Sequence, residues 1–126
     1  MFSFRKKYLA LALAACFPGT AMAQCDDNAS TAELTQCLGQ ELQRADAKLN
    51  AVYRKSLASM GDDAGAKANL LKSERAWVAY KEAQCFGVVG DMWAGGTGQS
   101  GAIAACQTGL TNLRIKELAE ATRDGG

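Results

Sequence analysis

Apolar residues recur at steps of three and four over long stretches of this chain, and this spacing predicts α-helices. Over residues 31–60 the recurrence matches one face of a helix and not the alternation of a strand. Ser30 and Glu33 stand at its start with the spacing of a capping box. We therefore expect a long first helix with the apolar face Leu34, Cys37, Leu38, Leu42, Ala45, Leu49, Val52, Tyr53, Leu57 and Met60.

A second helix is predicted over residues 64–85, and the rest of the chain is expected to pack on it. A large aromatic such as Trp77 anchors a small core because it buries much apolar area at one point. Gly61 suits the C-terminal cap of the first helix, and either following aspartate suits the N-terminal cap of the second. Because the connection is short, the two helices should be antiparallel neighbours. One row of the second helix holds Leu70, Glu74, Trp77 and Lys81.

Residues 86–101 contain six glycines and no helical period, so they are predicted to form a loop. A third helix is expected over residues 102–122. Its apolar stripe consists of Ile103, Cys106, Leu110, Leu113 and Leu118. The pattern contains no strand signal and no internal repeat. The predicted fold is therefore an all-α, three-helix antiparallel bundle with a glycine-rich loop between the second and third helices.

The first 23 residues have the organisation of a secretory signal peptide. Three basic residues precede a short apolar run, Pro18 and Gly19 break it, and Ala21-Met22-Ala23 fits a cleavage site before Gln24. The run is too short for a permanent membrane span. We expect a signal peptide at residues 1–23, a helical domain at 24–126, and a periplasmic protein.

A second interpretation of the leader is a lipoprotein signal. Leu13-Ala14-Ala15-Cys16 resembles a lipoprotein box, in which Cys16 would carry a lipid anchor and become the first mature residue. The break and the cleavage motif that follow at ordinary spacing favour the soluble form, and a bulky Phe17 suits lipidation poorly.

The net charge of the mature chain limits the kinds of partner that the protein is expected to bind. Cleavage removes three of the 14 basic residues and none of the 13 acidic ones, which leaves a net charge of −2. A balance this mild, without a basic run, argues against nucleic acid as a partner. It would also steer the domain only weakly toward a cationic protein.

Four cysteines remain after cleavage, and an even count in a small exported chain predicts two disulfides. A metal site is the alternative, but the chain has no Cys-x-x-Cys pair and no histidine. A hairpin that turns near Gly61 places all four at one end of the bundle, so proximity leaves the three possible pairings open. These cysteines are Cys25, Cys37, Cys85 and Cys106.

Catalytic chemistry has few candidates. Asp46, Glu74 and Arg75 would meet across the first two helices, either as a carboxylate pair for acid–base work or as an ion pair that fixes helix register. Without histidine, a serine-nucleophile signature or a phosphate loop, the ion pair is favoured. We expect no enzyme and no cofactor, and a structural core that includes Asp46, Leu49, Tyr53, Arg75, Trp77 and Tyr80.

The glycine-rich loop is the candidate binding surface. It follows no strand and lacks the lysine of a nucleotide-binding loop. Exposed apolar side chains on glycine-flanked loops are common interface anchors. In the alternative interpretation, Trp93 folds back and covers the end of the bundle. The candidate binding residues are Met92, Trp93, Thr97, Gln99 and Ser100.

Several segments together resemble the lysozyme inhibitor LprI-type N-terminal domain family of bacterial exported proteins. They are Cys37, residues 44–53 with the pattern Ala-Asp-x-x-Leu-Asn-x-x-Tyr, residues 71–85 with Arg-Ala-Trp, and Ala105, Cys106, Leu110, Thr111 and Arg114. The resemblance covers nearly the whole mature chain. It implies a compact, disulfide-bonded helical domain in the periplasm or on the cell envelope.

The family name implies inhibition of lysozyme, whose cleft works with two carboxyl groups. A protruding loop would block that cleft: Thr97, Gln99 and Ser100 would donate hydrogen bonds, and Trp93 would fill an apolar subsite. The alternative function is an envelope binding or immunity-type module that uses the same loop for another protein partner.

Overall fold

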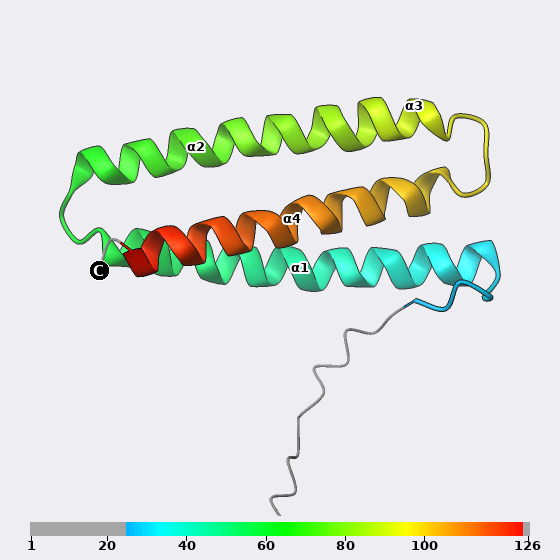
Figure 1. Ribbon diagram of the computed structural model, residues 1–126, viewed down its shortest axis with the longest axis horizontal. Helices are drawn as coiled ribbons and strands as arrows, with labels where there is room; N and C mark the ends of the chain where they lie inside the picture. The colour runs from blue at the N-terminus through cyan, green and yellow to red at the C-terminus, as the bar shows by residue number, and fades with distance from the viewer. Residues whose placement is uncertain (1–24, 125–126) are drawn as a thin grey trace, which may run out of the picture.

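The computed structural model describes residues 25–124, which form three long helical segments in up-down-up order (Figure 1). The elements are α1 (Thr31–Ser59), α2 (Ala64–Glu82), the π-helix η1 (Ala83–Val89), α3 (Gly90–Met92) and α4 (Gln99–Asp124). The predicted all-α fold with three helices and two disulfides is confirmed. The expected signal peptide and Cys16 lie outside the described residues.

Local capping explains where the first two helices begin and end. Ser30 Oγ accepts the amide of Glu33 at 3.2 Å, and the Glu33 carboxylate accepts the amide of Ser30 at 3.1 Å, so the predicted capping box is present. After α1, Gly61 adopts a positive φ of 55°, which glycine tolerates best. Asp63 then caps α2 by accepting the amide of Ala66 at 2.9 Å.

The predicted loop over residues 86–101 is wrong in its first half. The helical rod continues from α2 through η1 and α3, so the connecting loop spans only residues 93–98. Gly90 is buried against α4, where an added Cβ would lie 3.6 Å from Ile103 Cδ1. Packing and a cross-link to α4 hold this glycine-rich segment helical, and they outweigh the weak helix propensity of its residues.

The disulfides join Cys25 to Cys37 and Cys85 to Cys106. Both bridges lie toward the end of the bundle where α1 and α4 begin and the rod ends, as the hairpin geometry predicted (Figure 1). The first bridge ties the N-terminal segment to α1. The second ties η1 to α4, and Cys85 is fully buried.

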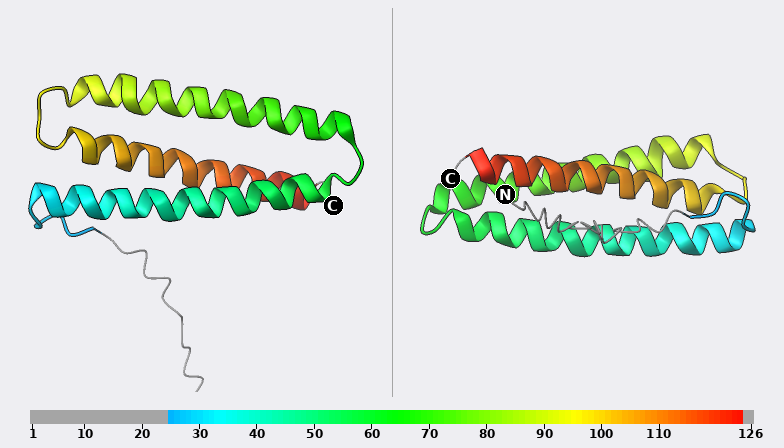
Figure 2. Two further views of the ribbon diagram at one scale, coloured as in Figure 1. Left: turned by 180° about the vertical axis from the view of Figure 1, so that it is seen from behind. Right: turned by 60° about the horizontal axis from the view of Figure 1, so that its bottom comes forward.

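The core lies mainly between α1 and α4, which run side by side and parallel (Figures 1 and 2). Leu49, Leu70, Ile115 and Leu118 form the buried cluster. Tyr53 and Trp77 pack against it from α1 and α2 and remain partly exposed. Apart from Leu70 and Trp77, α2 makes few close contacts with α4, and the rod packs more extensively on α4 through η1.

Two residues expected in the core lie outside it. Arg75 is exposed, and Tyr80 is 54% exposed. A helix turns by about 100° per residue, so Arg75 points away from the face that carries its neighbour Glu74. Tyr80 falls at the margin of the Leu70–Trp77 row for the same reason. Asp46 is half-buried on α1.

Candidate functional site

Exposed apolar side chains gather on the last part of the helical rod. Met92 is 77% exposed, Trp93 is 50% exposed, and Phe86 and Val88 are each more than half exposed. Burying such groups at an interface is favourable, because each removes apolar surface from water. This segment is the most apolar exposed surface near the predicted binding loop.

Trp93 combines the two arrangements that the sequence left open. Its ring packs on Gly98, where an added Cβ would lie 3.1 Å from Trp93 Cζ3. Half of the side chain nevertheless faces solvent. The ring therefore holds the loop together through one part of its surface and leaves another part available for contact.

The loop that carries Trp93 is short and tied at both ends. The Trp93 amide donates to the Val89 carbonyl at 3.2 Å, and the Gly96 amide donates to the Trp93 carbonyl at 3.0 Å. Gln99 Nε2 donates to the Gly90 carbonyl at 2.9 Å across the loop. A loop held in this way loses little conformational entropy when it binds.

The predicted polar binding residues divide into two groups. Thr97 and Ser100 are exposed. Gln99 is partly buried, and its amide nitrogen is committed to the Gly90 carbonyl. Gln99 therefore holds the loop in position, and Thr97 and Ser100 are the hydroxyl groups that face solvent.

The end of the bundle that carries this apolar segment is acidic. Residues 25–43 and 82–113, which we call the disulfide half, contain six carboxylates and no lysine or arginine. Asp26, Asp27, Glu33 and Asp91 are exposed. The Ser30 backbone amide and hydroxyl both donate to Glu33 and hold the pKa of its carboxyl below the ordinary value, so Glu33 keeps its charge to a lower pH than an ordinary glutamate.

The predicted meeting of Asp46, Glu74 and Arg75 does not occur as expected. Glu74 instead accepts from Arg114 Nε of α4 at 3.0 Å, and Arg114 also donates to Ser73 Oγ at 3.0 Å. The cation that pairs with Glu74 therefore comes from α4 and is not Arg75. The feature of the sequence that points to this ion pair is Arg114, the one arginine in residues 102–122, where it lies among the apolar positions of the predicted third helix.

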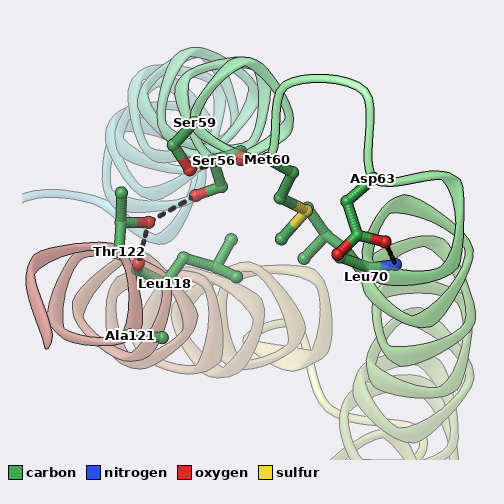
Figure 3. Close-up of a pocket in the computed structure, with 9 residues that line it drawn as sticks. Ser56, Ser59, Met60, Asp63, Leu70, Leu118, Ala121 and Thr122 are labelled. Atoms are coloured by element: carbon green, nitrogen blue, oxygen red, sulfur yellow. Dashed lines mark hydrogen bonds between the residues drawn. The ribbon is translucent and has the colours of Figure 1, made fainter. Parts of the chain in front are cut away.

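A pocket lies at the opposite end of the bundle, and sequence reasoning missed it (Figure 3). It measures about 380 Å³, and Met60, Leu70 and Leu118 supply its apolar lining. Its polar atoms are already used: the Ser56 and Thr122 hydroxyls lie 2.9 Å apart in a hydrogen bond, and Asp63 caps α2. These groups are occupied by the fold and assemble no acid–base pair.

The described part of the chain contains one cluster with the residue types of a metal site. Within residues 25–124, only Cys25, Cys37 and Glu41 lie close enough together to hold a metal ion. The two cysteines are bonded to each other, whereas the metal ligand is the thiolate. In the same part of the chain, no helix combines the length and apolarity needed to cross a bilayer.

These features define a small, disulfide-bonded helical domain whose accessible chemistry is an exposed apolar segment at an acidic end of the bundle. The chain belongs to the lysozyme inhibitor LprI family, because the family model described as "Lysozyme inhibitor LprI" matches residues 22–118. This confirms the resemblance noted in the sequence. An uncharacterized protein of Rhizobium meliloti (strain 1021) is 35% identical over 127 residues, covering 88% of this chain and 91% of the relative. No solved structure matches.

Proposed function

We propose that this protein binds lysozyme and inhibits it without catalysing a reaction. The observation that carries the proposal is the family match, which spans the first two helical segments, the loop, both disulfides and most of α4. The family's description names lysozyme inhibition. The match therefore covers the exposed loop as well as the scaffold that holds it.

In the proposed mode of binding, the loop at residues 93–98 and its flanks enter the lysozyme cleft. Met92 and Trp93 would fill an apolar subsite, since both are exposed at the end of the rod. Thr97 and Ser100 would donate hydrogen bonds toward the carboxyl groups of the cleft. Gln99 would keep the loop in its bound shape through Gly90.

We also propose that the domain acts in the periplasm. The signal features of residues 1–23 support export, and two disulfides fit an oxidising compartment. A lipid anchor at Cys16 is the alternative form. Mass spectrometry of the mature protein distinguishes a start at Gln24 from a lipidated Cys16.

The test is a lysozyme assay with residues 24–126 produced in an oxidising compartment. We expect a dose-dependent loss of lysozyme activity that disappears when the disulfides are reduced. Trp93→Ala with Ser100→Ala should abolish inhibition and leave the helical circular dichroism unchanged. The control is Leu71→Ala with Asn69→Ala, which removes an exposed apolar and an exposed polar side chain from α2 instead.

Two results would redirect the proposal. If the Trp93/Ser100 variant inhibits as well as the control, the loop is not the binding surface. If the folded wild-type domain leaves chicken-type, goose-type and invertebrate-type lysozymes unaffected, the target is another envelope protein.

A further inference from the structure

The charge of the molecule is divided between its two halves. The disulfide half carries six carboxylates and no basic residue, a net charge of −6. Residues 44–81 and 114–124, which we call the distal half, carry eleven basic and seven acidic residues, a net charge of +4. The overall charge of −2 therefore conceals a strong polarity along the bundle.

The fold maintains this polarity at the border between the halves. Lys81 is the basic residue that immediately precedes the disulfide half, and its ammonium lies over the Trp77 ring at 4.8 Å from the centroid. Trp77 is four residues earlier on α2, so this contact holds the charge toward the distal half. Arg114, at the corresponding border of α4, is paired with Glu74 and Glu117.

The negative half coincides with the apolar surface described above. Asp91 directly precedes Met92 and Trp93, and all three are exposed. Asp26, Asp27 and Glu33 lie where α1 begins, at the same end of the bundle as α3 and the loop (Figures 1 and 2). Exposed apolar and charged side chains at one end of the bundle supply the two kinds of group that protein interfaces combine.

We propose that the disulfide half docks onto a basic protein surface, in which lysine and arginine side chains surround an apolar depression. This inference rests on the proposed function and names the surface of the partner that the protein engages. The carboxylates steer the approach of the cationic partner, and Met92 and Trp93 hold the complex once it has formed.

The same charges argue against two other kinds of surface. Anionic lipid headgroups and nucleic acid phosphates would both repel a half that carries six carboxylates and no cation. A basic protein is therefore the macromolecule that this end of the bundle fits.

The test compares two variants with the same net charge. Asp27→Asn with Asp91→Asn removes two exposed carboxylates from the disulfide half, and Asp62→Asn with Glu120→Gln removes two from the distal half. Association with lysozyme is measured by stopped flow at low and high salt. We expect the first variant to associate several-fold to about tenfold more slowly at low salt, and the second to match wild type. High salt should abolish the difference.

A second pair of variants tests the contribution of the exposed apolar residue Met92. Met92→Ala should increase the dissociation rate with little change in association, because it removes contact area and no charge. Leu71→Ala, an exposed apolar residue in the distal half, should change neither rate.

The outcomes separate this inference from the proposed function. If both charge variants associate equally fast while inhibition persists, the docking surface is overturned and lysozyme inhibition stands. If wild type does not bind lysozyme, the proposed function fails and the inference fails with it.

Discussion

Arg114 of α4 forms polar contacts with Glu74 and Ser73 of α2. Its side chain is 9% exposed, that of its partner Glu74 is 18% exposed, and Ser73 accepts a further hydrogen bond. A buried guanidinium without a partner is costly, whereas an exposed surface pair contributes little. Together with Leu70 in the buried cluster, these polar contacts tie α2 to α4.

Replacing Arg114 by methionine should lower the free energy of unfolding by about 2–3 kcal/mol, since it leaves the Glu74 carboxylate partly buried and unpaired. The matched control is Arg75→Met. It removes an exposed arginine that is next to Glu74 in the sequence, and it should change the free energy of unfolding by less than about 0.5 kcal/mol. Urea denaturation measures both. Equal effects would show that Arg114 contributes no more than a surface charge.

At the scale of elements, the two disulfides perform different tasks. Cys25–Cys37 ties the segment before α1 to the first turns of that helix, with a sequence separation of 12. Cys85–Cys106 joins η1 to α4 and closes a loop of 21 residues that contains α3 and residues 93–98. Only the second bridge restrains the segment that displays Met92 and Trp93.

Removal of the second bridge by Cys85→Ala with Cys106→Ala should therefore increase amide hydrogen exchange across residues 83–98. Cys25→Ala with Cys37→Ala should leave exchange in that segment near the wild-type value, although each bridge contributes about 2–4 kcal/mol to stability. Mass spectrometry of peptides from the exchanged protein measures this. Equal exchange in the two variants would mean that packing alone orders η1 and α3.

The sequence predicted best those elements that are determined by interactions between residues close together in the chain. The capping box at Ser30, the cap at Asp63 and the period of the first stripe depend on neighbouring residues, and the bounds of α1 follow from them. The helical state of η1 was not predictable in this way, because Cys85 reaches Cys106 only in the folded chain. The partner of Glu74 and the pairing of the cysteines depend on tertiary contacts for the same reason.

For the candidate site, the sequence identified residues more readily than their roles. Met92, Trp93, Thr97 and Ser100 are exposed in the loop or beside it, and their role in binding stays a prediction. The internal role of Gln99 needed the contact with Gly90. The charge polarity was hidden in the overall sum, because it appears only when the helices are folded side by side.

The whole molecule is cross-linked at one end and more loosely packed at the other. Both bridges lie in the disulfide half, whereas a pocket of about 380 Å³ separates α2 from α1 and α4 in the distal half. Two alanines, Ala66 and Ala121, line this pocket. Their small side chains leave space between the helices.

Ala66→Leu should fill part of this space and raise the free energy of unfolding by about 0.5–1 kcal/mol. Ala68→Leu, which places the same side chain at an exposed position of α2, should change it by less than about 0.5 kcal/mol. Thermal or urea unfolding compares the two. A loss of stability with Ala66→Leu would show that α2 cannot approach its neighbours more closely.

The up-down-up order has a practical consequence for anyone handling this protein. The described chain begins at Cys25 in the disulfide half, and α4 ends at the far end of the bundle, beside the α1–α2 turn (Figure 1). An affinity tag or fluorophore joined before Cys25 would sit in the acidic disulfide half, whose surface carries Asp26 and Asp27. The same group attached after α4 would leave that surface clear, so sensor chips and fusion partners belong at the C-terminus.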